Sequence, residues 1–256
     1  MAVILSHNER AAATWGSGGQ HYERLSGSVS DALTHVVNHI APQPDERFLD
    51  VATGTGLTAR LLASRGATVT GTDFAAGLIE AAKALAPPID FQIADAEALP
   101  FEDSSFDAVT STFGVMFVAQ PEIAAREKWL VSARKGGRLG LATWAAEGTV
   151  TDLFAIIRSY MPPPPANPPP SPFEWGRSER VRDLLGDAFE LRFETGTTTL
   201  RMQSGESFWD LWVNGFGPAE ALAASCDPER RGPLKRDFIE FHGRSRRANS
   251  IRAGDL

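Results

Sequence analysis

The stretch Arg47–Gly56, RFLDVATGTG, constrains the fold more than any other part of the chain. It has the pattern of a short apolar strand that ends in an acid and runs into a glycine-rich turn. The following LTARLLASRG has helical spacing, with its leucines on one side. A strand, a tight turn and a helix start form a cradle in which a ligand can meet backbone N–H groups. Gly54 and Gly56 have no Cβ, so the chain can turn sharply and a ligand can lie against it.

The same alternation of strand and helix continues to Trp144. Apolar and β-branched runs predict strands at 48–51, 67–73, 89–94, 106–112 and 135–144. Helical spacing predicts helices at 57–66, 74–88 and 121–134. Strands that alternate with helices of this length predict an α/β fold, with a Rossmann-like, doubly wound and mostly parallel sheet.

The regions on either side follow other patterns. Residues 7–40 are predicted to be helical, with a break at the glycines at 16, 18 and 19. Beyond Trp144, helices are expected at 150–160, 178–187, 206–217, 218–224 and 228–244, and one bent strand or a hairpin at 189–203. The proline-rich run 161–175 is either a stiff spacer or part of a lid over a site. We divide the single domain into an N-terminal helical cap (1–44), a cofactor-binding core (45–145) and a region with the rest of the sheet and a helical substrate lid (146–256).

Composition excludes several classes of protein. The chain has 256 residues, a net charge of −7 and a pI near 5.3. This acidic balance disfavours a nucleic-acid partner, whose phosphates carry the same charge. Cys226 is the single cysteine, so no intramolecular disulfide is possible and a reducing, cytoplasmic location is expected. No run of about 20 apolar residues predicts a membrane span, and a homodimer is compatible with these features.

Three acids lie at or just after the ends of predicted strands, at the sheet edge where open α/β folds bind ligands. A pyrophosphate beside Asp50 would meet a like charge, whereas a cationic amino group would be attracted. Asp73 can accept from both hydroxyls of a ribose. Asp95 can accept from an adenine amino group, the Ala96 N–H can bond to the adjacent ring nitrogen, and Phe74 can pack on the adenine face. However, GTGLTA also satisfies the dinucleotide pattern G-x-G-x-x-A, and an acid at the Asp73 position is shared with nicotinamide sites.

Together these blocks resemble class I S-adenosylmethionine-dependent methyltransferases, in particular the ubiquinone/menaquinone-biosynthesis type and the type 11 small-molecule enzymes. LDVATGTG resembles the first motif of the family, GTD its ribose acid, DAEALPFEDSSFDAV its adenine-binding and fourth-strand motifs, and KGGRLGLATW its fifth strand. The resemblance implies a seven-stranded sheet and S-adenosyl-L-methionine as cofactor. The implied cofactor-binding residues are Asp50, Ala52, Thr53, Gly54, Gly56, Asp73, Phe74, Asp95, Ala96, Ser111 and Thr112.

The chain departs from the family pattern at two places. Ala52 stands where the common first motif has a glycine, and an alanine is tolerated there if its φ is negative. The family often closes its sheet with an antiparallel strand near the C-terminus, but RSRRANSIRAGDL makes a poor strand. Either the 189–203 segment supplies both last strands, or the final strand is short or absent.

No residue is clearly marked as catalytic. A sulfonium methyl is already activated, so the protein mainly aligns a nucleophile and excludes water. His21 and Tyr22 are candidates, because resembling enzymes often cover the cofactor with this segment, although a surface histidine and a packing tyrosine are simpler interpretations. His35 and His39 lie four apart on a predicted helix, but no carboxylate or cysteine pattern accompanies them. We therefore predict no metal site.

The acceptor region is indicated only by aromatic residues. In resembling enzymes the turn at Ser111–Phe113 faces the methyl donor and the acceptor. Trp144, Trp209, Trp212 and Phe216 are candidates for the wall of an apolar acceptor pocket, or for ordinary core.

The predicted function is methyl transfer to a small, apolar or aromatic molecule. The alternatives are an NAD(P)-dependent oxidoreductase that uses the GTGLTA turn, and a non-catalytic methyltransferase-like binding protein.

Overall fold

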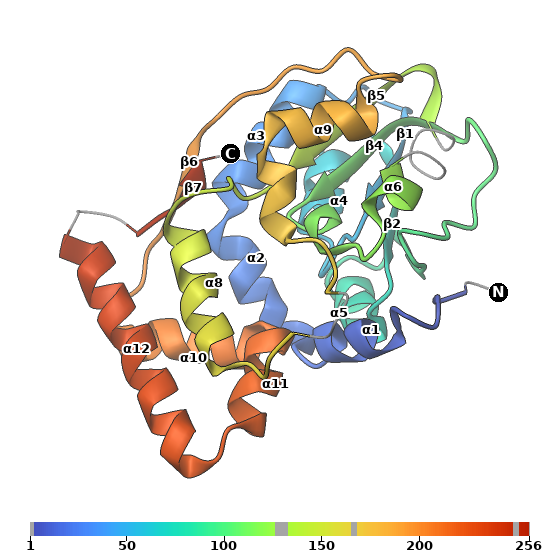
Figure 1. The fold of residues 1–256 in the computed structure, drawn as a ribbon. Helices are drawn as coiled ribbons and strands as arrows, with labels where there is room; N and C mark the ends of the chain where they lie inside the picture. The colour runs from blue at the N-terminus through green and yellow to red at the C-terminus, as the bar shows by residue number, and fades with distance from the viewer. Residues whose placement is uncertain (1–2, 126–132, 165–167, 248–250, 256) are drawn as a thin grey trace.

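A five-stranded parallel sheet forms the centre of the molecule (Figure 1). The computed structural model describes residues 3–125, 133–164, 168–247 and 251–255. The sheet has the order β3-β2-β1-β4-β5. Its strands are β1 (Arg47–Val51), β2 (Thr68–Asp73), β3 (Asp90–Ile93), β4 (Phe106–Thr112) and β5 (Ala133–Ala142). The predicted Rossmann-like, doubly wound α/β fold is confirmed, but this sheet has five strands instead of the seven that the resemblance implies.

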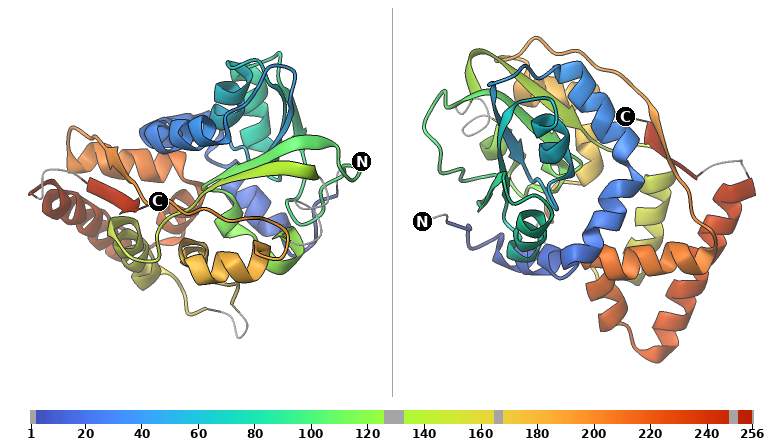
Figure 2. Two further views of the ribbon diagram at one scale, coloured as in Figure 1. Left: turned by 90° about the horizontal axis from the view of Figure 1, so that it is seen from above. Right: turned by 180° about the vertical axis from the view of Figure 1, so that it is seen from behind.

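Helices cover both faces of the sheet (Figure 2). The strands are buried on both sides, so neighbouring residues enter different cores: Phe48 packs toward one face and Leu49 toward the other. One face carries α3 (Ser30–Ile40), α4 (Leu57–Ala63) and α5 (Ala76–Leu85). The other carries η2 (Val115–Phe117), α6 (Pro121–Ile123), η4 (Pro172–Gly176) and α9 (Ser178–Leu185).

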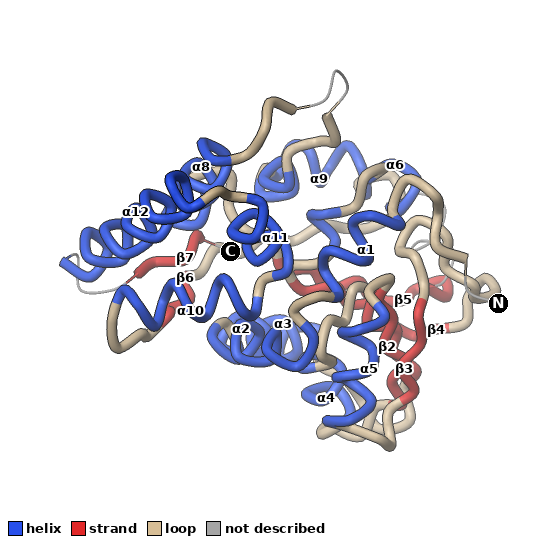
Figure 3. The backbone as a smooth tube through the Cα atoms, turned by 90° about the horizontal axis from the view of Figure 1, so that it is seen from below, coloured by secondary structure: helices blue, strands red, loops and turns tan. Residues whose placement is uncertain are grey.

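A helical layer with its own apolar core stands beside the sheet (Figure 3). It contains α8 (Thr149–Tyr160), α10 (Gly205–Gly215), α11 (Gly217–Ser225) and α12 (Pro228–Arg247). The N-terminal segment, α1 (Glu9–Gly16), η1 (Gly19–His21) and α2 (Tyr22–Ser28), links this layer to α5. Its helix ends at Gly16, where the glycines predicted a break. In the described part of the chain no helix is both long and apolar enough to cross a membrane.

The final strand is short, as the second of the two sequence-based alternatives has it, but it lies outside the main sheet. β6 (Thr197–Leu200) pairs antiparallel with β7 (Ile251–Asp255), and the two form a separate small sheet. The 189–203 segment therefore supplies one strand, not a hairpin, and the C-terminal stretch that seemed a poor strand supplies the other. Backbone pairing with β6 outweighs the weak intrinsic preference of that stretch.

The predicted helix at 121–134 is also corrected at its end. The α-helix α6 ends at Ile123, and residues 126–132 of the prediction lie outside the described residues. Ala133 already pairs with Phe106 in the sheet, ahead of a register shift in the β4–β5 ladder. The fifth strand therefore begins before the glycine pair at 136 and 137, with Gly136 at a φ of 79°.

The strand order reverses between β1 and β4. The chain moves outward from β1 to β2 and β3 on one side, and from β4 to β5 on the other. In open parallel sheets, the crevice at the carboxyl ends of the strands on either side of this reversal is where ligands bind. The turns that follow Val51 and Thr112 lie at that crevice.

Candidate functional site

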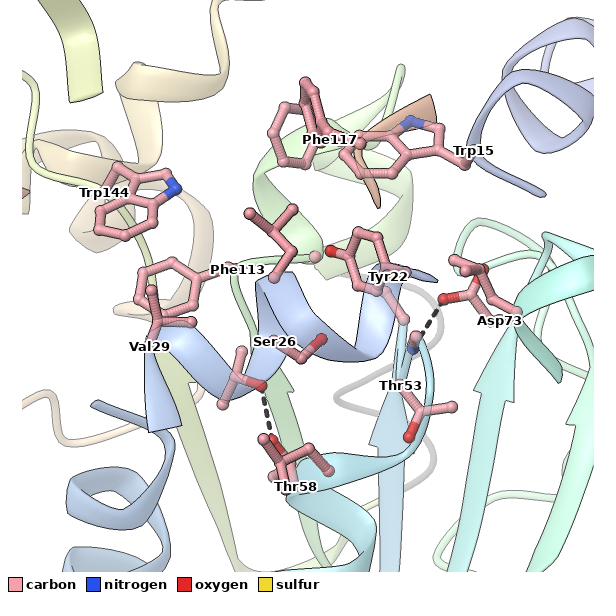
Figure 4. A pocket seen from close by; sticks show the side chains of 18 of the residues that line it. Trp15, Tyr22, Ser26, Val29, Thr53, Thr58, Asp73, Phe113, Phe117 and Trp144 are labelled. Carbon is pink, nitrogen blue, oxygen red and sulfur yellow. Dashed lines mark hydrogen bonds between the residues drawn. The ribbon is translucent and has the colours of Figure 1, made fainter. Parts of the chain in front are cut away.

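A pocket opens at the carboxyl ends of β1, β2, β3 and β4, and the helical layer partly covers it (Figure 4). One half is formed by strand ends and polar side chains, and the other by aromatic side chains from distant segments. Of the eleven cofactor-binding residues predicted from the sequence, eight line it: Ala52, Thr53, Gly54, Asp73, Phe74, Asp95, Ala96 and Thr112. The structure thus brings together residues that are far apart in the chain.

The turn after β1 contains backbone strain that was not expected. Ala52 has a φ of 54°, so the condition under which we expected an alanine to be tolerated is not met. A left-handed conformation costs a non-glycine residue roughly 1–2 kcal/mol. The neighbouring chain allows the Ala52 methyl group to fit, because Gly114 has no Cβ and one built there would collide with it.

The two glycines of the turn serve different purposes. Gly54 has a φ of 59°, and a Cβ there would lie 3.1 Å from Cε1 of Tyr22, on the pocket side. Gly56 has a φ of 81°, and its Cβ would lie 2.5 Å from Cζ of Phe91, inside the protein. Gly54 therefore leaves room at the pocket surface, whereas Gly56, which does not line the pocket, allows the turn to pack on β3.

Asp73 ends β2 and faces the pocket. Its Oδ2 accepts from the Gly54 N–H at 3.0 Å and its Oδ1 from the Ala75 N–H at 2.9 Å. The Phe74 backbone N–H also interacts with this carboxylate, and of its about four acceptor positions one remains for a further donor. Burial raises the pKa of Asp73 to about 6, against the opposing effect of the backbone donors. Asp73 is therefore a buried carboxylate that is fixed by backbone N–H groups and still able to bind a hydroxyl.

Asp50 lies behind the turn instead of on the pocket wall. Its oxygens accept from the Thr53 hydroxyl at 2.6 Å and the Thr110 hydroxyl at 2.7 Å. Burial raises its pKa to about 6, and the nearby Asp73 carboxylate adds to the rise. In this geometry Asp50 does not contact a cationic amino group in the pocket directly. Asp50 connects the ends of β1 and β4 to the turn, and it acts on such a group only through the electrostatic field of its carboxylate.

Asp95 lines the pocket but is already surrounded by donors. Asn8 donates to its Oδ1 at 3.2 Å and to its Oδ2 at 3.0 Å, and the Leu5 N–H donates to Oδ2 at 3.0 Å. The Glu97 N–H adds a bond to Oδ1 at 3.0 Å. A carboxylate offers about four acceptor positions, so the N-terminal segment occupies those that an adenine amino group would use. The predicted contact of Asp95 with adenine requires Asn8 and Leu5 to shift.

The second half of the pocket is apolar. Trp15 of α1 packs on Phe117 with ring centroids 4.7 Å apart and on Phe216 at 5.0 Å. Phe113, after β4, stacks on Trp144 at 4.2 Å. Further lining residues come from α8, α10, α12 and β6: Leu153, Phe154, Leu200, Phe208, Trp212 and Phe241. Trp212 is buried, and its indole Nε1 has no hydrogen-bond partner within the described residues.

The two candidate catalytic residues lie differently. Tyr22 lines the pocket beside the Thr53 turn, and Figure 4 shows its hydroxyl directed away from Asp73 toward Phe113. Burial, together with the Asp73 carboxylate, raises the pKa of Tyr22 above its usual value. The hydroxyl is therefore a hydrogen-bond donor at neutral pH, not a base. His21, at the end of η1, is exposed and does not line the pocket.

Of the two predicted residues at the end of β4, Ser111 is buried in the core and Thr112 lines the pocket. The Ser111 hydroxyl accepts from the Val115 N–H at 3.2 Å and is buried behind the wall. The Thr112 hydroxyl faces that of Thr58 at 2.7 Å, at the pocket floor. The sequence did not predict that Asn8 and Trp15 line the pocket, or that Phe113 has a positive φ of 57°. Nothing in the chain near Asn8 or Trp15 signals that they meet the strand ends.

In the part of the chain that the structure describes, the ionisable side chains that line the pocket are all acidic, so any charge they carry is negative. The described lining residues include Asp73, Asp95, Glu97 and Tyr22, and no lysine, arginine or histidine. A pyrophosphate carries the same charge as these carboxylates, so this wall disfavours it. It suits a ligand that carries hydroxyl groups and positive charge.

Comparison with known proteins agrees with this geometry. Residues 49–140 match a family model described as a methyltransferase domain. An uncharacterised protein of Mycobacterium tuberculosis (strain ATCC 25618 / H37Rv) is 38% identical over 187 residues, which cover 70% of this chain and 68% of that protein. The chain belongs to the class I S-adenosylmethionine-dependent methyltransferases, and the resemblance seen in its motifs is confirmed. This assignment leaves the oxidoreductase alternative without support.

Two further proteins are similar to this chain, one in the sequence of its core and one in its fold. A demethylmenaquinone methyltransferase of Renibacterium salmoninarum is 42% identical over 110 residues, 43% of this chain and 46% of that enzyme. A crystal structure of a protein from Anabaena variabilis, described as a methyltransferase from an antibiotic biosynthesis pathway, has a TM-score of 0.63 at 15% identity, covering 88% of this chain and 94% of that one. At that identity the similarity concerns the fold alone.

Proposed function

We propose that this methyltransferase uses S-adenosyl-L-methionine to methylate a small, neutral and apolar acceptor. The observation that carries the proposal is the division of one pocket into two chemically different halves. Carboxylates and backbone N–H groups line the half at the strand ends, and aromatic side chains line the half under the helical layer.

The strand-end half fits the cofactor. Asp73 offers an acceptor position to a ribose diol, Phe74 and Ala96 flank the adenine position, and the missing Cβ of Gly54 leaves space at the turn. When bound, S-adenosyl-L-methionine supplies a methyl group activated by a positive sulfonium sulfur. Because the described residues of the wall include carboxylates and no basic group, it favours a cationic ligand over a phosphorylated one.

The aromatic half fits the acceptor. An anionic acceptor would lose its hydration without gaining a cationic partner, so a neutral one is favoured. The described wall has no histidine, and Tyr22 is held in its protonated form, so neither a histidine nor this tyrosine serves there as a general base. The chain contributes chiefly by orienting the acceptor between Trp144, Phe154 and Trp212 and by excluding water.

Two measurements with the purified chain test the proposal. Calorimetry with S-adenosyl-L-methionine should show one site, and methyl-labelled cofactor should transfer label to neutral aromatic compounds but not to matched carboxylated ones. Absence of cofactor binding would refute the assignment of the strand-end half. Binding without transfer to any neutral compound would favour the non-catalytic alternative, and transfer only to anionic compounds would refute the proposed acceptor class.

The remaining expectations belong to the same proposal. A cytoplasmic location is supported by the single, free Cys226. The small-molecule acceptor is supported by the apolar half of the pocket, which the helical layer partly covers.

A further inference from the structure

Two histidines and a glutamate meet on the surface, away from the strand ends. His35 and His39 lie one turn apart on α3, and Glu194 comes from the irregular segment before β6. His35 Nε2 lies 2.9 Å and His39 Nε2 3.1 Å from Oε2 of Glu194. The sequence showed the histidine pair but no carboxylate, because Glu194 is 155 positions further along the chain than His39. The fold supplies the ligand whose absence argued against a metal.

We propose that His35, His39 and Glu194 form a binding site for a divalent late transition metal, with Zn²⁺ as its simplest occupant. Imidazole nitrogen and carboxylate oxygen are both zinc ligands, and three protein ligands leave a fourth position for water. At zinc–ligand distances near 2.0–2.2 Å, tetrahedral ligand atoms lie about 3.3 Å apart. All three ligand atoms already lie within 4.8 Å of one another.

The hydrogen bond of His39 favours a cation at this place. His39 Nδ1 lies 3.0 Å from the backbone oxygen of His35. A carbonyl oxygen only accepts, so Nδ1 carries the hydrogen, and in the neutral ring Nε2 holds a lone pair. That lone pair faces a carboxylate oxygen at 3.1 Å, so two acceptors oppose each other unless a proton or a metal ion lies between them. A hydrogen-bonded Nδ1 is also the usual way in which proteins orient a metal-binding imidazole.

A metal ion satisfies this arrangement better than protons. The imidazole rings have centroids 4.1 Å apart. With protons alone, His35 can donate to Glu194 from Nε2 as a neutral ring, but His39 needs a second proton to do so, because its Nδ1 already carries a hydrogen. One divalent ion instead accepts a lone pair from each ring and from Glu194. A nearby hydrogen bond from Thr198 to Asp31 holds the same two parts of the chain together without the metal.

The site connects two parts of the pocket wall. Leu33 of α3 and Leu200 of β6 both line the pocket, and Glu194 leads into β6. A metal ion shared by His35, His39 and Glu194 would therefore fasten the strand to α3. This role does not depend on the identity of the methyl acceptor.

Zinc titration of the chelator-treated full chain tests the site. Calorimetry should show one zinc ion per chain. His35→Ala, His39→Ala and Glu194→Gln should each weaken binding at least about tenfold. Glu190→Gln, an exposed carboxylate in the same segment, and His21→Ala, an exposed histidine elsewhere, should leave zinc affinity unchanged. Circular dichroism identifies any variant that fails to fold, in which case the other two ligand variants decide.

The melting temperature distinguishes a specific zinc site from non-specific binding of zinc to the surface. Zinc should raise the melting temperature of the unmodified chain and of Glu190→Gln, and leave that of Glu194→Gln unchanged. The proposal is overturned if zinc does not bind at equimolar concentration. It is equally overturned if the ligand variants bind zinc as tightly as the controls, in which case the three side chains form only a hydrogen-bonded ion-pair cluster.

Discussion

The two halves of the pocket are built in opposite ways. The strand-end half comes from short turns directly after β1, β2 and β3, and its polar atoms are fixed by backbone donors, as at Asp73. The aromatic half comes from helices spread over most of the chain, and rings held by packing form its wall. One half is thus specified by local sequence and hydrogen bonds, and the other by tertiary packing.

This difference indicates how specificity divides between the halves. A carboxylate held by N–H groups tolerates little change, because any replacement leaves buried donors unpaired. An aromatic wall can accept substitutions that keep its volume, so its ligand can change without loss of the fold. We expect cofactor recognition to be sensitive to single atoms, and acceptor recognition to depend on shape and on a few polar groups.

Replacement of Asp73 should have the largest effect and is the strongest test of the polar half. Asp73→Ala removes an acceptor of charge-assisted bonds, so affinity for S-adenosyl-L-methionine should fall by about 1.5–3 kcal/mol, measured by calorimetry. The apo protein should also lose about 1–3 kcal/mol of stability in a urea titration, because the Gly54 and Ala75 N–H groups lose their acceptor. Asp90→Asn, at the exposed start of β3, is the control and should change neither. Unchanged cofactor affinity in Asp73→Ala would remove this residue from the site.

The pH dependence of cofactor binding should be the next largest effect. The pKa of Asp73 is about 6 because of burial, so the carboxylate that binds a ribose is increasingly protonated below that pH. Affinity should fall about tenfold between pH 7 and pH 5 for one such proton. In the apo protein the sign is opposite: an acid with a raised folded pKa lowers stability as pH rises from about 4 to about 6. Asp73→Asn should flatten the binding profile and reduce the slope of the stability profile, to which Asp50, with its pKa also near 6, still contributes. An unaltered binding profile in that variant would assign the proton to another group.

A smaller effect should identify the polar group of the aromatic half. Trp212 has a buried indole N–H without a partner in the described part of the chain, which we expect the acceptor to satisfy. Trp212→Phe keeps a ring in the wall, so KM for the best neutral acceptor should rise about fivefold, near 1 kcal/mol, while cofactor affinity stays constant. Trp209→Phe is the matched control, because Trp209 lies on the same helix but packs on Phe238 outside the pocket. Equal changes in both variants would show a packing effect only.

The same division explains which features could be predicted from the sequence. The parallel core and the acid of β2 are encoded in contiguous stretches, in which strand period, glycine turn and helix spacing occur together. The position of Asp50 behind the turn was not predictable, since it depends on hydroxyls from Thr53 and Thr110, the latter on another strand. Likewise, the pairing of β6 with β7 and the contact of Asn8 with Asp95 join segments far apart in the chain, and periodicity carries no information about such partners.

The smallest expected effect concerns strain at the boundary between the halves. Ala52→Gly relieves a φ of 54°, which costs an alanine roughly 1–2 kcal/mol, while glycine gains about 0.5–1 kcal/mol of entropy in the unfolded chain. The variant should therefore be more stable by up to about 1 kcal/mol in urea titration. Ala41→Gly provides a matched comparison, because Ala41 has a φ of 47° at the end of α3, is exposed and does not line the pocket.

Both variants should gain similar stability, but only Ala52→Gly should alter the kinetics of methyl transfer. Its extra backbone freedom lies at the junction of the cofactor and acceptor positions, where alignment matters most. A loss of kcat in Ala52→Gly with unchanged cofactor affinity would show that the strained alanine holds the two halves in register. If kcat is unchanged, the alanine is only a tolerated departure from the family motif, and alignment rests on Phe113 and the aromatic wall.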